Sequence, residues 1–97
     1  MRVVFAPEAR EEILEAAAYY RDRSSRSAEK FGVDIARAIA LLAEFPGAGS
    51  PISRNARRLL LRKFPYQFIY RVEGESIRVY AVAHLKRRPR YWRRQLP

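Results

Sequence analysis

YQFIYRVEGESIRVYAVA, residues 66–83, is the stretch that decides the fold of this 97-residue chain. Two runs rich in Tyr, Phe, Ile and Val, 66–72 and 76–83, flank the polar residues Glu73, Gly74 and Glu75. β-Branched and aromatic residues favour strands, and a short Gly-containing segment between two such runs is typical of a β-hairpin. The sequence therefore predicts two antiparallel strands joined by a tight turn.

The two faces of this hairpin are predicted from the alternation of side chains along a strand. In the second strand the residues expected to face a helical layer are Ile77, Val79, Ala81 and Ala83. The residues then expected to face away are Arg78, Tyr80, Val82 and His84. Since the outward set is not cleanly polar, we expect a second layer, such as a partner chain, to cover part of that face.

Two amphipathic helices are predicted before the hairpin. The first begins at Pro7, whose missing amide donor is not needed there, and Glu8 favours the positive end of the helix dipole. A polar turn over 21–26 follows, and Ser27 is expected to cap the second helix, which Pro46 and Gly47 end. The apolar stripes that support these helices are Ala9, Ile13, Ala16, Ala17 and Tyr20, and then Phe31, Ile35, Ala38, Ile39 and Leu42.

The remaining segments complete a single α+β domain over residues 1–97. A short strand is predicted at 2–5, a loop at 46–56, a basic strand at 58–62 and a short terminal helix at 90–95. The resulting order is βααβββ, with the helical hairpin packed on a mainly antiparallel sheet and a basic C-terminal tail.

The positive charge of the chain lies in its second part. The chain has 20 Lys and Arg against 10 Asp and Glu, a net charge of +10. Residues 1–53 contain seven basic and eight acidic residues, whereas residues 54–97 contain 13 basic and two acidic ones. Such an excess predicts a polyanionic or acidic partner, namely nucleic acid or an acidic protein segment.

Several classes of protein are excluded by what the sequence lacks. There is no Cys, which excludes disulfide scaffolds and Cys-ligated zinc. No apolar run is long enough for a signal peptide or a membrane span, so a cytoplasmic location is expected. The basic part offers only Glu73, Glu75 and His84 as metal ligands, so we expect neither a metal nor another cofactor.

A resemblance to a known family rests on Arg58, the Phe64-Pro65-Tyr66 strand entry, Tyr70 and an ending of the form His84-x-x-Arg87-x-Pro89-x-x-Trp92. With these features in this order, the chain resembles the RelE/ParE toxins of type II toxin–antitoxin modules, and among them the ParE-like members. The resemblance implies a βααβββ fold and an antitoxin encoded alongside.

The resemblance leaves the target of the toxin open. ParE-like members inhibit DNA gyrase and serve in plasmid stabilisation, whereas RelE-like members are metal-independent ribonucleases that cut mRNA in the ribosome. The leading expectation is a non-enzymatic, ParE-like inhibitor of DNA gyrase, and the alternative is a ribosome-dependent endoribonuclease. A third reading is an inert module that acts only as a corepressor with its antitoxin.

Ribonuclease chemistry without metal needs an acid, a base and a positive charge near the phosphate. The candidates for these roles are His84, Arg58, Arg62 and Tyr91. The sequence departs here from the ribonuclease members of the family. Its 46–53 loop has no charged residue, and Leu85 follows His84 where some relatives carry Tyr.

The residues expected to bind the target or an acidic antitoxin arm are Arg57, Arg58, Arg62, Lys63, Arg87, Arg88, Arg90, Trp92 and Arg93. In the tail three roles stay open: contact with phosphates and bases, contact with an acidic protein surface, or attachment of the tail to the sheet through Trp92. The antitoxin arm is expected to fold on binding, as a helix or an added strand.

Overall fold

The elements along the chain follow the predicted order, with one further short strand. The computed structural model describes residues 1–88 and 90–97, so Pro89 of the C-terminal motif lies outside the described residues. The elements are β1 (Arg2–Phe5), α1 (Pro7–Arg23), α2 (Ser25–Glu44), β2 (Ser50–Pro51), β3 (Arg57–Leu60), β4 (Tyr66–Glu73), β5 (Ser76–His84) and the 3-10 helix η1 (Tyr91–Gln95).

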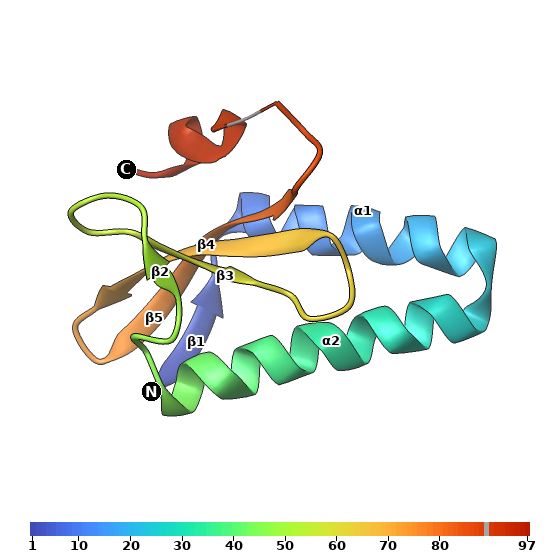
Figure 1. The fold of residues 1–97 in the computed structure, drawn as a ribbon, viewed down its shortest axis with the longest axis horizontal. Coiled ribbons are helices and arrows are strands. Elements are labelled where there is room, and N and C mark those ends of the chain that lie inside the picture. Colours follow the sequence, from blue (N-terminus) through green and yellow to red (C-terminus); the bar gives the residue numbers. More distant parts are fainter. Residues whose placement is uncertain (89) are drawn as a thin grey trace.

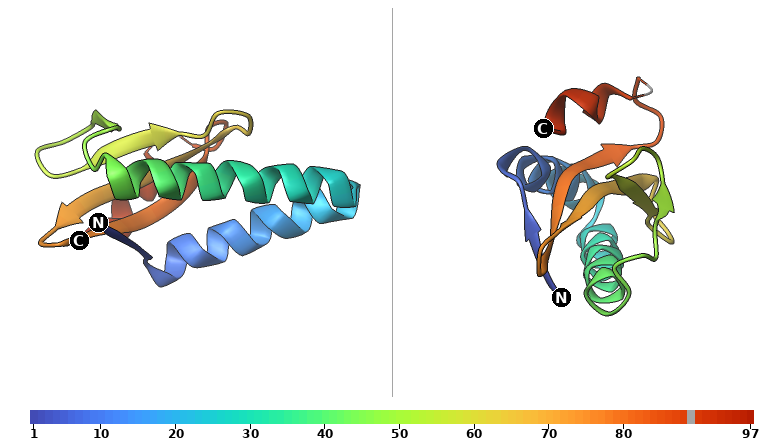
Figure 2. Two further views of the ribbon diagram at one scale, coloured as in Figure 1. Left: turned by 90° about the horizontal axis from the view of Figure 1, so that it is seen from below. Right: turned by 90° about the vertical axis from the view of Figure 1, so that its left-hand side faces the viewer.

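The strands form one sheet in the order β1-β5-β4-β3-β2 (Figure 1). β1 runs parallel to β5, and the other neighbours are antiparallel. The predicted hairpin is the β4–β5 pair, whose turn places Gly74 at a φ of 61°, a left-handed conformation that suits glycine. The two helices lie antiparallel on one face of the sheet, as predicted (Figures 1 and 2).

A β-bulge in β5 changes which side chains face the helices. Ile69 pairs with Ala81 and Tyr70 with Val79, so Tyr80 is the extra residue on β5. One extra residue reverses the alternation beyond it. As a result Val82 belongs to the core cluster with Phe68. The prediction that Ala81 and Ala83 face the helices is therefore wrong, as is the outward position expected for Val82 and His84.

The junction between the helices is shorter than predicted. Ser24 alone links α1 to α2, and its side chain accepts the Ser27 N–H at 3.0 Å. Ser24 is therefore the N-cap of α2, and the prediction of Ser27 as the cap is wrong. Arginine favours helices, and the Arg23 guanidinium lies over the Tyr19 ring at 4.3 Å, which stabilises the last turn of α1.

The core lies between the helices and the sheet. Phe31 and Leu42 of α2 pack with Phe68, Tyr70 and Val79 of the sheet, all with at most 1% of their surface exposed. Burying one such side chain contributes about 1.5–3 kcal/mol, so this layer stabilises the fold strongly.

The 46–51 loop is attached to the core through Tyr70. The Tyr70 hydroxyl donates to the Pro46 carbonyl at 2.8 Å and accepts the Gly49 N–H at 2.9 Å. A Cβ added at Gly49 would lie 2.5 Å from the Arg58 carbonyl oxygen, so only glycine fits this close approach. These contacts hold β2 beside β3.

The second face of the sheet is covered in part by the chain itself. Ile69, Ala81 and Ala83 are 0% exposed although they face away from the helices. η1 packs on β5, on the side of the sheet opposite α2 (Figure 2). The second layer expected from the mixed outward face is thus supplied here by the C-terminal segment.

Candidate functional site

The C-terminal segment is held by Glu12 of α1. β1 pairs with β5 only as far as Val79, so among the described residues no strand pairs with the far half of that edge of β5. The Glu12 carboxylate accepts the Val82 N–H at 2.8 Å, the Tyr91 hydroxyl at 2.6 Å and the Gln95 amide at 3.3 Å. Gln95 also donates to the Tyr80 carbonyl at 3.0 Å. We call Glu12, Tyr91 and Gln95 the tail anchor.

Beside the tail anchor lies a cavity of about 370 Å³, which we call the cationic cavity. Five arginines line it, and no carboxylate is found among its described lining residues. Its lining consists of Ile52, Arg58, Gln67, His84, Leu85, Arg87, Arg88, Arg90, Tyr91, Trp92 and Arg93. Such a concentration of guanidinium groups favours an anionic ligand.

Strand alternation determines which basic residues of β3 reach this cavity. Arg58 pairs with Ile69 and therefore lies on the outer face of the sheet, where the cationic cavity is. Arg57 pairs with Tyr70 on the opposite face, and its guanidinium donates to the Gly49 carbonyl at 2.7 Å. Arg57 therefore stabilises the 46–51 loop and does not line the cavity.

Arg62 and Lys63 lie away from the cavity as well. Their main-chain N–H groups, with that of Phe64, donate to the Asp34 carboxylate of α2 at 3.3, 2.8 and 3.0 Å. Asp34 is 2% exposed, so this contact fixes the loop after β3 on α2. Of the residues proposed for target or antitoxin binding, Arg57, Arg62 and Lys63 are thus the ones that the fold separates from the rest.

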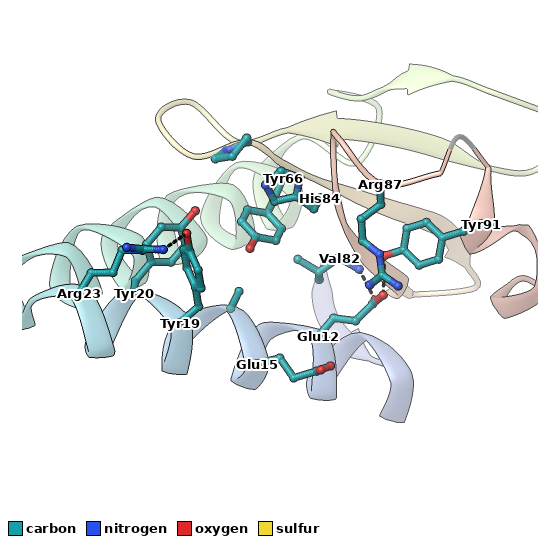
Figure 3. A pocket seen from close by; sticks show the side chains of 12 residues that line it. Glu12, Glu15, Tyr19, Tyr20, Arg23, Tyr66, Val82, His84, Arg87 and Tyr91 are labelled. Atoms are coloured by element: carbon teal, nitrogen blue, oxygen red, sulfur yellow. Dashed lines mark hydrogen bonds between the residues drawn. The ribbon is translucent and has the colours of Figure 1, made fainter.

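His84 lies between the cationic cavity and a second hollow. Its Nδ1 accepts the Lys86 N–H at 3.0 Å, so a neutral ring carries its proton on Nε2. The ring contacts Tyr66 edge to face, with centroids 4.9 Å apart. On the other side is an aromatic groove of about 600 Å³ between α1 and the ends of β4 and β5, lined by Tyr19, Tyr20 and Tyr66 among others (Figure 3).

Tyrosine hydroxyls near the site hold their protons strongly. Burial, and then the hydrogen bond to Glu12, raise the pKa of Tyr91 well above its ordinary value. Burial also raises the pKa of Tyr66 to about 12. The guanidinium of Arg87 lies 4.3 Å from the centre of the Tyr91 ring. Tyr91 therefore acts as a hydrogen-bond donor that positions the tail, and its proton is not readily released.

The acidic residues of α1 face part of the basic tail. Glu8, Glu11, Glu12 and Glu15 form one helical stripe, and they line a hollow of about 610 Å³ together with Arg87, Arg88, Tyr91, Arg94 and Gln95. Arg87 and Arg88 line both this hollow and the cationic cavity. The positive charge of the tail thus lies partly against these carboxylates and partly in the cationic cavity, where Arg90 and Arg93 join Arg58 of β3.

Sequence reasoning did not identify three residues that shape the candidate site or the fold around it. Gln67 lines the cationic cavity, and the only sequence signal was one uncharged polar residue within an apolar strand. Glu12 holds the tail, and the i, i+3, i+4, i+7 spacing of the α1 acids indicates a common face without indicating its partner. Asp34 lies on the apolar face of α2, and the sequence does not indicate which N–H groups its buried carboxylate accepts.

Within residues 1–88 and 90–97, no three His, Asp or Glu side chains gather in a way that would hold a metal ion. Likewise, no helix in this part of the chain combines the length and apolar character of a membrane span.

Comparison with known proteins agrees with this architecture. A search of curated proteins found no match. Among solved structures, a chain of the chromosomal ParDE toxin–antitoxin system from P. aeruginosa has the same fold, with a TM-score of 0.76 at 21% identity over 89% of this chain and 97% of that one. The family model for the ParE toxin of the type II toxin–antitoxin system parDE matches residues 3–89. The chain therefore belongs to the ParE toxin family of type II toxin–antitoxin systems.

Proposed function

We propose that this ParE-family toxin inhibits DNA gyrase and is neutralised by a cognate acidic antitoxin. The observation that carries the proposal is the family match over residues 3–89, because ParE-like toxins act on gyrase. The cationic cavity supports it, since Arg58, Arg90 and Arg93 present positive charge away from the carboxylates of α1.

The arrangement of the candidate catalytic residues favours binding over catalysis. Arg58, His84 and Tyr91 line one cavity, which is the observation in favour of the ribonuclease alternative. However, the Tyr91 hydroxyl already donates a hydrogen bond to Glu12, and burial together with this contact raises its pKa. Arg62 lies at the Asp34 contact on α2. Of the four candidates, Arg58 and His84 are therefore the ones left to supply the acid, the base and the positive charge that metal-free RNA cleavage needs.

An acidic antitoxin arm has two adjacent surfaces to occupy. The aromatic groove accepts apolar side chains, and the cationic cavity next to it accepts carboxylates. Because ion pairs weaken as salt rises while apolar burial does not, affinity for the antitoxin is expected to fall with salt to a residual value. An affinity that stays flat as salt rises would contradict the electrostatic part of this proposal.

The test is to express the toxin alone and then to add the purified protein to gyrase. Under the proposal, DNA synthesis stops before protein synthesis, and supercoiling by gyrase is inhibited. Arg58→Ala should weaken the inhibition, whereas the matched control Arg54→Ala, an exposed arginine outside the cavity, should not. Unchanged supercoiling with no trapped cleaved DNA would refute the gyrase target. Cleavage of mRNA on ribosomes that is lost in His84→Ala and Arg58→Ala would support the ribonuclease instead.

A further inference from the structure

The cationic cavity contains two groups that an acidic protein surface would not require. Gln67 is 8% exposed, and its Oε1 has no hydrogen-bond partner among the described residues. Trp92, which is partly exposed, lines the same cavity. A buried amide without a partner costs free energy, so a ligand with polar groups of its own would stabilise this site.

The arginines of the cavity come from two distant parts of the chain. Arg58 lies on β3, whereas Arg87, Arg88, Arg90 and Arg93 lie in the C-terminal segment. Guanidinium groups bind phosphate oxygens in pairs of parallel hydrogen bonds, which makes arginine well suited to phosphate. The convergence of these residues in one concave site indicates a phosphate-containing ligand.

The other lining groups match the other half of a nucleotide. An indole ring is a stacking surface for an unpaired base, and a glutamine amide carries both a donor and an acceptor for a base edge. A volume of about 370 Å³ is at the small end of ligand sites, so it suits one unstacked nucleotide and excludes a duplex.

We infer that the cationic cavity binds one nucleotide, with its phosphate on the arginines, its base against Trp92 and the base edge on Gln67. The nucleotide is either free or part of a single strand, because both present the same phosphate and base. The cavity is the one whose positive charge supports the proposed action on gyrase, but nucleotide binding is measured on the toxin alone and can hold or fail independently of that action.

Trp92 gives a direct readout, because it is the only tryptophan of the chain. Stacking of a base on an indole quenches its fluorescence. The full-length toxin is titrated with thymidine monophosphate, a short oligothymidylate, inorganic phosphate and an oligoglutamate. Quenching by the first two supports the site, and tighter binding of the strand than of the monophosphate identifies the strand as the source. If neither the monophosphate nor the oligothymidylate quenches the fluorescence, the inference is overturned. Equal quenching by oligoglutamate also overturns it and indicates an acidic protein as the ligand.

Two variants separate specific contacts from general attraction by charge. For a single strand, Arg58→Ala should lower the slope of log affinity against log salt by about 0.7, whereas the control Arg54→Ala should leave it unchanged. Gln67→Met keeps the length of the side chain without its amide, so it should weaken binding by about five- to tenfold at every salt concentration. Equal effects of Arg54→Ala and Arg58→Ala would overturn the inference. Since Arg58 is exposed, its variant tests the site even if Gln67→Met fails to fold.

Discussion

Removal of the Glu12 carboxylate is the most informative perturbation of the fold around the site. In Glu12→Ala two donors lose their acceptor, namely the main-chain N–H of Val82 and the Tyr91 hydroxyl. Val82 has only 1% of its surface exposed. The bond from Gln95 is longer, at 3.3 Å, and contributes less. The variant should therefore detach η1 from α1, and it removes the acceptor of the Val82 main-chain N–H near the end of β5.

The size of the effect follows from these contacts. A hydrogen bond to a charged group contributes about 1.5–3 kcal/mol net. Two such bonds are lost, but release of the tail lets water reach both donors, so we expect a loss of about 3 kcal/mol. Against a typical stability of about 5–15 kcal/mol, such a loss is large and measurable. Glu12→Gln retains one acceptor and is expected to cost about 1 kcal/mol.

Urea unfolding measures the free energy, and hydrogen exchange of the η1 amides shows whether the tail is released. Detachment should also shift the emission of Trp92 toward that of a solvated indole. Glu15→Ala is the matched control, because Glu15 lies one turn further along α1 and is exposed; it should change stability by less than about 0.5 kcal/mol. If Glu12→Ala is as stable as Glu15→Ala and its η1 amides remain protected, the tail anchor does not hold the segment.

Three further predictions concern the same framework. Asp34→Asn replaces the carboxylate that accepts the N–H groups after β3 by an amide, which has one acceptor atom instead of two. The free energy of unfolding, measured in urea, should fall by about 2 kcal/mol. Tyr70→Phe removes both contacts to the 46–51 loop; about 1–3 kcal/mol should be lost, and an unchanged midpoint would show that the loop does not need them. Because the pKa of Tyr66 is about 12 when folded and near 10 when unfolded, the stability that its protonated form provides is complete below about pH 10 and should decline from there to about pH 12. Tyr66→Phe should reduce that decline when unfolding is measured at each pH.

Local sequence patterns were sufficient for the order of the elements except β2, which lies within the segment predicted as a loop. The two apolar periodicities and the turn at Gly74 predicted the helical hairpin and the β4–β5 hairpin, and Pro46 with Gly47 predicted the end of α2. Each of these signals acts over a few residues, and the tertiary structure agrees with them.

The details that failed depend on contacts between distant residues. The bulge at Tyr80 is a property of strand pairing, so strict alternation placed His84 and Val82 on the wrong face. Arg57 and Arg58 are adjacent and identical in type, and only the register with β4 sends one to the loop and the other to the cavity. The lack of a partner for Gln67 Oε1 likewise cannot be inferred without the cavity that it lines.

The early end of β1 has a consequence for how this sequence can vary. Beyond the end of β1, the main-chain groups of β5 form hydrogen bonds with side chains in place of a neighbouring strand. These side chains, Glu12 and Gln95, come from opposite ends of the chain. Main-chain pairing tolerates almost any residue, whereas this substitute depends on particular ones. A change at either end of the chain is therefore expected to persist among relatives only with a compensating change at the other, so that the first helix and the last turn co-evolve.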